Sequence, residues 1–559
     1  MLDVTLNTKF VVGANVRGDM ASADWRFLLP RLSFERVLCL GVPALPVVSV
    51  LSGMCKSMIV AGSNKKRLTR AIAECNARNI ANVESMHVHD LSSLPCPTQS
   101  IDLIYIASTK KRRSYLDDRA VARELSRVLQ ENGIIYFEAD LPNEQTELVA
   151  GLDDLKKFDL STPRVFRVTP QHGEMQTAIP IHDATTESFF RKKVIDEPSF
   201  VSRTLEKFSG KQRYAMITQR SSMEFNGHLP EYLLSVAVSN GKDLHAYRWG
   251  MSAMGRRNTR KVLFFLLNKE SGEAEAVVKL TRSAAFNSRL ENEYRALAEL
   301  NKKSVVNAET FPQPLFFGHS GSLAILGEKI IHGKPFRKAT SATIDCSFAK
   351  AAFEWIIDLG ENTADSKADG AARVAEVLRN LFDQFKQIYK LTTSEHTFLV
   401  NQIEAIAQSP AGFPTVFQHG DPGIWNVMAT DSGGVAFLDW EAAEQQGMPL
   451  WDLFYFLRSY GTWMSQRAGM RDSLKSFAKN FILPSDASKL LQHLTQDYCE
   501  RVRLNKSLVE PLFYTCWMHR ALKEATRLSA AKIEKGHYVN LLRLCIENRQ
   551  AAGLAQLFS

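Results

Sequence analysis

Short apolar runs alternate with amphipathic stretches through residues 30–140. Five of the runs have the length of buried strands, at residues 36–40, 57–61, 85–89, 101–106 and 133–138. Between them, residues 68–79 and 117–129 place apolar side chains at the three- and four-residue spacing of a helix. Strands and helices that alternate in this way predict an α/β domain built on a doubly wound parallel sheet.

The pattern changes in the second half of the chain. Residues 261–267 and 274–280 are two apolar runs joined by a polar turn, which is typical of a β-hairpin. Residues 287–300 follow with apolar side chains on one helical face. Helical periodicity then recurs at residues 351–359, 372–391 and 397–407, and again from about residue 486 to the C-terminus. A hairpin and a helix ahead of a long helical region predict an α+β domain.

Composition excludes several classes of protein. The 559 residues suggest three or four structural units at about 150 residues each, and 45% hydrophobic with 23% charged residues is ordinary for a globular chain. No apolar run approaches the roughly 20 residues that span a bilayer, and the N-terminus lacks a signal-peptide pattern. We therefore expect a cytoplasmic protein without a transmembrane segment. The eight cysteines include no C-x-x-C pair, so buried reduced thiols are expected.

The chain is basic, with 69 Lys and Arg residues, 60 Asp and Glu residues and a net charge of +9. Such an excess favours an anionic partner, such as a nucleotide, an acidic glycan or a membrane surface, and is compatible with peripheral or complex association. The basic clusters at residues 65–67 and 110–113 are typical of solvated loops or helix faces. No nucleic-acid-binding module accompanies them, so we expect no nucleic-acid partner.

The most informative motif is His419-Gly-Asp-Pro-Gly-Ile-Trp-Asn426, followed by Phe437-Leu-Asp-Trp-Glu441. Phosphoryl transfer from a magnesium nucleotide needs one carboxylate to orient the acceptor hydroxyl and take its proton. It also needs an amide and a second carboxylate to hold the metal. Asp421 fits the first role, Asn426 and Asp439 fit the second, and His419 is assigned to support of this catalytic loop. Without a function, His419 would be a core histidine and Asp439 the cap of a strand.

Protein kinases carry His-Arg-Asp with an Asn at the same offset and then Asp-Phe-Gly, whereas this chain has Gly for Arg and Asp-Trp-Glu for Asp-Phe-Gly. This variant resembles the aminoglycoside phosphotransferase and choline kinase family. The resemblance implies a two-lobed, protein-kinase-like α+β domain with ATP and Mg²⁺ as cofactors and a small-molecule or glycan acceptor. The intact set of motif residues argues against an inactive pseudokinase.

The same resemblance assigns the phosphate-binding side chains. Lys279 ends an apolar run, where such kinases place the lysine that binds the α- and β-phosphates, and Glu293 corresponds to the acid that holds this lysine. Residues 250–258 take the place of the phosphate-covering loop. Ser252 and the backbone near Gly255 are therefore expected to contact phosphate.

Two further segments resemble the family. Residues 323–335 are similar to its hinge strand, so the backbone from Glu328 to Ile330 is expected at the adenine edge. Residues 449–457 match a P-x-x-D-L stretch. Asp452 in that stretch is expected to accept hydrogen bonds that tie the catalytic loop to the following helix.

The first domain resembles a class I S-adenosylmethionine-dependent methyltransferase. His89-Asp-Leu-Ser-Ser-Leu-Pro95 is similar to that family's fourth-strand region, and residues 124–133 are similar to the helix and turn before its fifth strand. The apolar runs at residues 164–168 and 213–218 would then be the antiparallel pair that completes the sheet.

The loop that should approach the methyl-donor cofactor departs from this family. It reads Cys39-Leu-Gly-Val-Pro-Ala-Leu-Pro46, so it keeps one glycine and contains two prolines that stiffen it and remove donors. Gly62 lies where an acidic side chain would bind the ribose hydroxyls, and Asp90 is the one cofactor-contacting position that matches. The resemblance therefore implies a domain that binds S-adenosylmethionine poorly or not at all.

We expect a methyltransferase-like domain at residues 1–222, a linker at 223–240, a kinase N-lobe at 241–335 and a kinase C-lobe at 336–559. The leading hypothesis is an ATP-dependent phosphotransferase acting on a hydroxyl of a small molecule or glycan. Two alternatives stay open. One is a bifunctional kinase and methyltransferase, for example in surface polysaccharide modification, and the other is a non-catalytic assembly protein.

Overall fold

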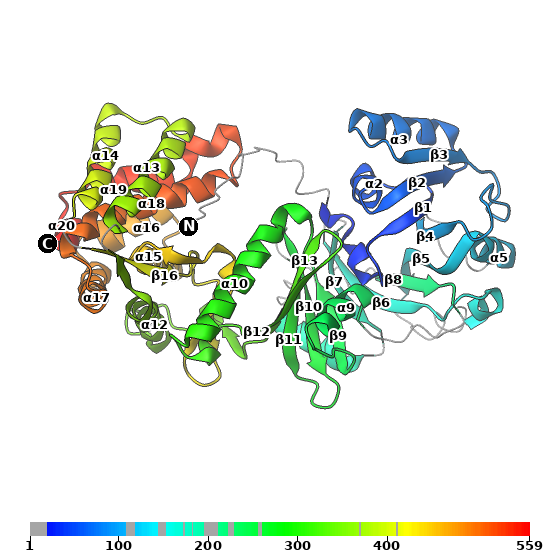
Figure 1. Ribbon diagram of the computed structural model, residues 1–559, viewed down its shortest axis with the longest axis horizontal. Coiled ribbons are helices and arrows are strands. Elements are labelled where there is room, and N and C mark those ends of the chain that lie inside the picture. Colours follow the sequence, from blue (N-terminus) through cyan, green and yellow to red (C-terminus); the bar gives the residue numbers. More distant parts are fainter. Residues whose placement is uncertain are drawn as a thin grey trace. The chain divides into compact units, whose positions relative to one another are not determined.

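The computed structural model describes residues 20–107, 118–142, 153–171, 174–181, 183–194, 211–221, 229–254, 260–367, 370–409 and 412–559. These residues form two compact units (Figure 1). The sheet unit consists of the described residues within Asn15–Leu290 and Leu315–Ile330, and the helical unit of those within Glu291–Pro314 and Ile331–Ser559. The strands of the predicted kinase N-lobe up to residue 330 thus belong to the same compact unit as the described N-terminal strands.

A sheet of 13 strands runs through the sheet unit in the order β12-β13-β11-β10-β9-β7-β6-β8-β5-β4-β1-β2-β3. The strands are β1 (Phe34–Leu40), β2 (Cys55–Gly62), β3 (Val83–His87), β4 (Ile101–Ile106), β5 (Leu129–Pro142), β6 (Arg164–Gln171), β7 (Glu174–Pro180), β8 (Lys211–Gln219), β9 (Tyr247–Ser252), β10 (Lys261–Asn268), β11 (Ala274–Thr281), β12 (Pro314–Ser320) and β13 (Leu323–Lys329). Neighbours among β1 to β5 pair in parallel, and the order reverses beside β1. β8 then pairs antiparallel with both β5 and β6. This arrangement confirms the predicted doubly wound fold.

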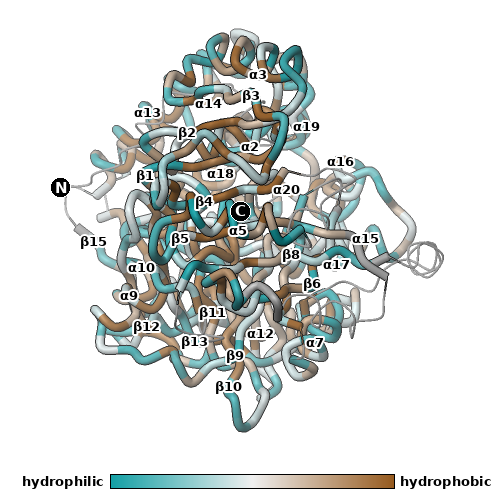
Figure 2. The backbone as a smooth tube through the Cα atoms, turned by 90° about the vertical axis from the view of Figure 1, so that its right-hand side faces the viewer, coloured by the Kyte–Doolittle hydropathy of each residue, from teal (hydrophilic) through white to brown (hydrophobic). Residues whose placement is uncertain are grey.

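Both faces of the inner parallel strands β1 and β4 are buried. Along β1, Val37 and Cys39 belong to one hydrophobic cluster, whereas Leu38 and Leu40 belong to another. Successive side chains of a strand point to opposite faces, so the continuous apolar run predicted here fills a core on each side of the sheet. The backbone coloured by hydropathy shows apolar segments along the inner strands (Figure 2).

The helices of the sheet unit lie before β1 or between these strands in the sequence. They are η1 (Asp24–Leu28), α2 (Leu45–Ser52), α3 (Lys65–Ala77), α5 (Arg119–Val128), η2 (Asp153–Phe158), α7 (Ala184–Phe189), η3 (Phe190–Val194), α9 (Glu231–Ser239) and η4 (Ala284–Phe286). α9 lies inside the segment expected to be a linker, so the structure differs from that expectation. It buries Tyr232 and Leu233, and Tyr232 Oη donates to the carbonyl oxygen of Phe27 over 2.7 Å. The helix has only nine residues and follows a polar segment directly, so the sequence pattern did not predict it.

The sheet continues from the methyltransferase-like strands into the strands of the predicted nucleotide-binding lobe. β7 pairs antiparallel with β9, and Thr177 lies opposite Ser252. A Cβ atom on Gly250 of β9 would lie 2.5 Å from Cε2 of Phe190, so this close approach requires glycine. The phosphate-covering loop expected after β9 therefore begins at a strand that the N-terminal domain holds in place.

A buried ion pair connects the same two parts of the sheet unit. Arg282, directly after β11, binds Asp24 of η1, with Nε at 2.9 Å from Oδ1 and Nη2 at 2.7 Å from Oδ2. Both side chains are almost fully buried, at 2% and 1% exposure. Arg282 Nη2 also donates to the carbonyl oxygen of Ala253 over 3.0 Å. Burial lowers the pKa of the neighbouring Arg26 to about 10, and Arg26 Nη2 donates to the carbonyl oxygen of Arg282.

The helical unit is dominated by helices and confirms the predicted α+β class. Its helices are α10 (Asn287–Lys303), whose first residues lie in the sheet unit, η5 (Ala308–Thr310), α11 (Phe336–Ala339), α12 (Ser347–Thr363), α13 (Gly370–Ile388), α14 (Thr393–Ala407), η6 (Trp440–Ala442), α15 (Trp451–Arg467), α16 (Ser473–Phe477), η7 (Ala478–Ile482), α17 (Asp486–Val502), η8 (Lys506–Leu508), α18 (Val509–Ala525), η9 (Ala530–Lys535), α19 (His537–Glu547) and α20 (Ala552–Phe558). Among the described residues, no helix is both long and apolar enough to cross a membrane.

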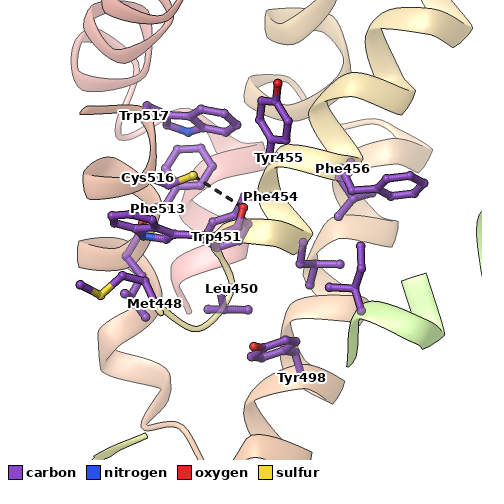
Figure 3. Packing of buried hydrophobic residues seen from close by; sticks show 14 of the residues in the cluster. Met448, Leu450, Trp451, Phe454, Tyr455, Phe456, Tyr498, Phe513, Cys516 and Trp517 are labelled. Atoms are coloured by element: carbon purple, nitrogen blue, oxygen red, sulfur yellow. Dashed lines mark hydrogen bonds between the residues drawn. The ribbon is translucent and has the colours of Figure 1, made fainter. Parts of the chain in front are cut away.

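Two three-stranded sheets carry the loops of interest in this unit. The first has the order β14 (Gly333–Pro335), β17 (Val427–Thr430), β18 (Val435–Phe437), and the second has the order β15 (Asp365–Lys367), β16 (Phe413–Gln418), β19 (Glu444–Gly447). Aromatic side chains fill the core between α15 and α18 (Figure 3). Trp451 Nε1 donates to the carbonyl oxygen of Leu512 over 3.0 Å, and Cys516 Sγ donates to that of Trp451. These contacts fix α18 against α15, the helix that follows the predicted metal-binding motif.

Candidate active site

Asp452 holds the loop that carries the His-Gly-Asp motif. It lies in the first turn of α15 at 7% exposure. Its carboxylate accepts the backbone N–H groups of His419 at 2.6 Å and Gly420 at 3.1 Å. Burial raises the pKa of this carboxyl, and the nearby charge of Arg520 opposes the rise. Gly420 has φ of +77°, and a Cβ atom there would lie 2.0 Å from the carbonyl oxygen of Ala442. These contacts agree with the expectation that Asp452 ties the loop to the helix.

His419 supports the same loop from inside the core. Its ring is fully buried and its centroid lies 4.4 Å from that of Trp440. Nε2 lies 3.0 Å from the carbonyl oxygen of Leu438, and Nδ1 accepts the N–H of Asp421 at 3.2 Å. Burial lowers the pKa of His419, and the two hydrogen bonds assign the proton of the neutral ring to Nε2. The ring can therefore orient Asp421 without contacting substrate.

The proposed metal ligands lie at one end of the β17–β18 hairpin. Val427 pairs with Phe437, so Asn426 and Leu438 lie just outside this pair, and Asp439 follows one residue later. The N–H of Leu438 donates to the carbonyl oxygen of Asn426 over 2.8 Å. Asp439 has a left-handed backbone with φ of +66°, which is uncommon for a residue other than glycine and recurs at functional sites.

Asp421 is joined to this pair through Asn426. Asn426 Nδ2 donates to the backbone oxygen of Asp421 over 2.9 Å and lies 3.5 Å from its Oδ2 atom. Because the amide nitrogen is used in this way, the amide oxygen of Asn426 remains for a metal, and Asp439 adds a carboxylate. In the described part of the chain, no group of three or more His, Cys, Asp or Glu side chains could hold a metal ion. An amide oxygen and a carboxylate are oxygen donors of the kind that Mg²⁺ takes together with phosphate oxygens and water.

Two cations beside Asp421 come from a distant part of the sequence. Arg520 on α18 places Nη1 3.3 Å from Asp421 Oδ1, and its guanidinium lies 3.3 Å from the ring centroid of Tyr455. Lys523, one turn further on, donates through Nζ to the carbonyl oxygen of Gly420 over 3.3 Å. Burial and the neighbouring Arg520 lower the pKa of Lys523. Sequence reasoning missed both residues, because 99 positions separate Arg520 from Asp421 and only the fold joins them.

The sheet unit carries the remaining predicted nucleotide contacts. Lys279 of β11 is buried, and its Nζ lies 2.5 Å from Glu328 Oε1 on β13. The side chain of Glu328 therefore binds the lysine, whereas the sequence assigned only its backbone a role. The N–H of Ile330 donates to the carbonyl oxygen of Glu275 over 2.9 Å, so it is already used within the sheet. Ser252 is buried at the end of β9, and Gly255 lies outside the described residues.

Glu293 belongs to the helical unit, on α10, and is fully buried. Its Oε1 accepts the N–H of Trp440 at 3.2 Å. Trp440 directly follows Asp439, so Glu293 stabilises the backbone next to a predicted metal ligand. The ion pair of Lys279 with Glu293 stays a prediction.

Comparisons with known proteins give different matches for the two halves of the chain. The first half is similar to solved structures, including a SAM-dependent methyltransferase of Aquifex aeolicus with 15% identity over 36% of this chain and 97% of that one, at a TM-score of 0.23. The YcgJ protein of Bacillus subtilis has 15% identity over 37% of this chain and 98% of its own, with a TM-score of 0.23. Spermidine synthase of Thermotoga maritima has 13% identity over 37% and 60%, with a TM-score of 0.24. TM-scores this low carry no argument about the fold, which the strand order of the sheet defines by itself.

The second half matches at the level of a family. No curated protein sequence matches the chain significantly. The model of the phosphotransferase enzyme family, APH, matches residues 260–479, which include β10, β11, the His-Gly-Asp loop and α15. Residues 260–479 of this chain are therefore similar to the phosphotransferase enzyme family.

Proposed function

We propose that this protein transfers the γ-phosphoryl group of ATP to a hydroxyl of a small molecule or glycan. The observation that carries the proposal is the hydrogen bond of Asn426 to Asp421 at the end of the β17–β18 hairpin, where the chain also continues from β18 into Asp439. This arrangement lies inside the segment that matches a phosphotransferase family. The chemistry depends mainly on position and charge, because the transferred group passes through a loose transition state.

Asp421 would orient the acceptor hydroxyl and accept its proton as the new O–P bond forms. Its carboxylate is partly exposed, at 29%, and is held by Arg520 on one side and Asn426 on the other. Asn426 and Asp439 would hold Mg²⁺, which offsets the negative charge that develops on the phosphates. His419 and Asp452 fix the backbone of the loop, so that Asp421 loses little freedom when the acceptor binds.

A turnover assay tests the proposal directly. The purified chain is incubated with Mg²⁺, γ-labelled ATP or GTP, and a panel of sugars, cyclitols and amino alcohols. We expect labelled product with at least one acceptor and slow release of ADP without one. If neither transfer nor ADP release depends on Asp421, the protein is not a kinase and the assembly-protein alternative gains support.

Asp439→Asn is expected to weaken the binding of Mg·ATP, whereas Asp452→Asn is expected to lower the stability of the fold. Asp439→Asn removes a charge from the proposed metal site. The concentration of Mg·ATP that gives half-saturation should therefore rise at least about tenfold, which is the loss seen when even a hydrogen-bond partner of a metal ligand is removed. Asp452→Asn leaves one acceptor for two buried N–H groups, so it should cost about 1–3 kcal/mol of unfolding free energy.

Magnesium titrations of ATP turnover and melting curves of both variants separate these outcomes. A matched control is Asp431→Asn, an exposed position in the turn of the same hairpin. If Asp452→Asn were the poorer metal binder, the assignment of the two carboxylates would be reversed.

S-adenosylmethionine is expected to bind the full chain weakly. The Asp90 carboxylate is already engaged by Ser92, with N at 2.9 Å from Oδ1 and Oγ at 2.7 Å from Oδ2. Gly62 offers no acid to the ribose, and such a charge-assisted hydrogen bond is worth about 1.5–3 kcal/mol, or a factor on the order of ten or more in affinity. Calorimetry with S-adenosylmethionine and S-adenosylhomocysteine measures this. Low-micromolar binding of either compound would instead support the bifunctional kinase and methyltransferase.

A further inference from the structure

Trp425 is exposed in the middle of the catalytic loop. Its side chain is 49% exposed, although large apolar residues in the described part of the helical unit are mostly buried. It lies between Asp421 and Asn426 in the sequence, where the turn is closed by the N–H of Gly423 on Asp421 and the N–H of Asn426 on Gly423. An exposed indole at this point costs hydration free energy, so a ligand that covers it would gain binding energy.

The indole is held in one place by its neighbours. A Cβ atom on Gly423 would lie 2.3 Å from Cζ2 of Trp425, so the ring lies directly against the glycine backbone. Tyr455 meets the ring at 6.1 Å between centroids and an interplanar angle of 85°. The guanidinium of Arg520 lies over the ring of Tyr455 and also contacts Asp421. A chain of contacts therefore connects the exposed indole to the proposed proton acceptor.

The charges around Asp421 disfavour a cationic acceptor. Asp421 already has Arg520 as its partner, and Lys523 lies beside the same loop at the carbonyl oxygen of Gly420. Asp452 is occupied by backbone N–H groups. Lys523 has the carboxylate of Glu444 as a charge neighbour, whereas Arg520 lies on the ring of Tyr455, which contacts the indole. A quaternary ammonium or polyamine on the indole would approach this guanidinium, and like charges side by side are unfavourable. A neutral ring with hydroxyl groups carries no such penalty.

We infer that Trp425 is the platform on which the acceptor lies, and that the acceptor is an uncharged polyhydroxylated ring, a sugar or a cyclitol. This inference rests on the proposed kinase function. The C–H face of such a ring would stack on the indole, whose π-face is negative. One ring hydroxyl would then reach Asp421, while Arg520 and Lys523 offer donors to neighbouring oxygens. Trp425 thereby determines specificity, and it takes no part in the transfer of the phosphoryl group.

Kinetics with two classes of probe test the inference. ATP-dependent phosphorylation is measured with methyl glycosides and myo-inositol on one side, and with choline and kanamycin on the other. We expect turnover in the first class alone. Trp425→Ala should raise KM for the accepted ring at least tenfold and change kcat less than threefold, whereas Trp425→Phe should keep KM within about threefold. Leu483→Ala, which removes another exposed apolar side chain (55%) of the helical unit, should change neither.

Each contrary result has its own meaning. Faster turnover of choline or kanamycin than of any neutral ring overturns the acceptor class. An unchanged KM in Trp425→Ala overturns the platform. If no neutral ring is phosphorylated while ADP release still requires Asp421, the acceptor inference fails and the kinase stands. If ADP release does not require Asp421, the proposed function itself fails.

Discussion

Asp421→Ala is expected to lower phosphoryl transfer by about 10³-fold or more, because a positioned general base contributes roughly 10²–10⁴-fold. The variant also loses the anchor between Arg520 and Asn426. Its partly exposed side chain contributes little to the core, so the fold should persist. Initial rates of product formation and of ADP release, compared with wild type at saturating Mg·ATP, measure the effect.

Two controls keep this result interpretable. Asp431→Ala changes an exposed carboxylate in the neighbouring hairpin turn and should leave rates unchanged. Circular dichroism and melting curves of Asp421→Ala should match wild type. A rate within a factor of about three of wild type, from a folded Asp421→Ala protein, would remove the basis of the kinase proposal.

Sequence alone predicted what depends on local pattern. The alternation of apolar runs located β1 to β5, and helical spacing located α12, α13 and α14 within a few residues. The motif residues Asp421 and Asn426 also come together, because only a short turn separates them. Helical or strand periodicity and short turns can be predicted from neighbouring residues in the sequence.

What the sequence did not predict depends on contacts between distant segments. Arg520 reaches Asp421 from α18, and Lys279 binds Glu328 from a neighbouring strand. The local pattern marks neither Arg520 nor the carboxylate of Glu328, since a charged residue on a helix or strand end usually faces solvent. The pairing of β7 with β9 was also not predicted, because the sequence of a strand says little about which strand it pairs with.

Asp24→Ala is expected to lower the unfolding free energy by about 3–5 kcal/mol, the usual cost of leaving one partner of a buried ion pair alone. Arg282 would keep its charge at 2% exposure with its carboxylate removed. Because Arg282 also binds the carbonyl oxygen of Ala253, directly after Ser252, the start of the phosphate-covering loop should loosen as well. We therefore expect KM for ATP to rise. Urea denaturation followed by tryptophan fluorescence measures the first effect, and steady-state kinetics the second.

Two comparisons make the Asp24→Ala result specific. Glu35→Ala breaks an ion pair with Lys56 that is exposed at 68% and 77%, so it should cost less than about 1 kcal/mol and leave KM unchanged. The double variant Asp24→Leu with Arg282→Met replaces both charges by apolar groups, and should be more stable than Asp24→Ala, since no buried charge is left without a partner. If Asp24→Ala were no worse than Glu35→Ala, the buried pair would not hold the N-terminal strands to the predicted nucleotide-binding strands. A double variant that recovers stability but not KM would show that Arg282 acts on the loop through its hydrogen bond to Ala253.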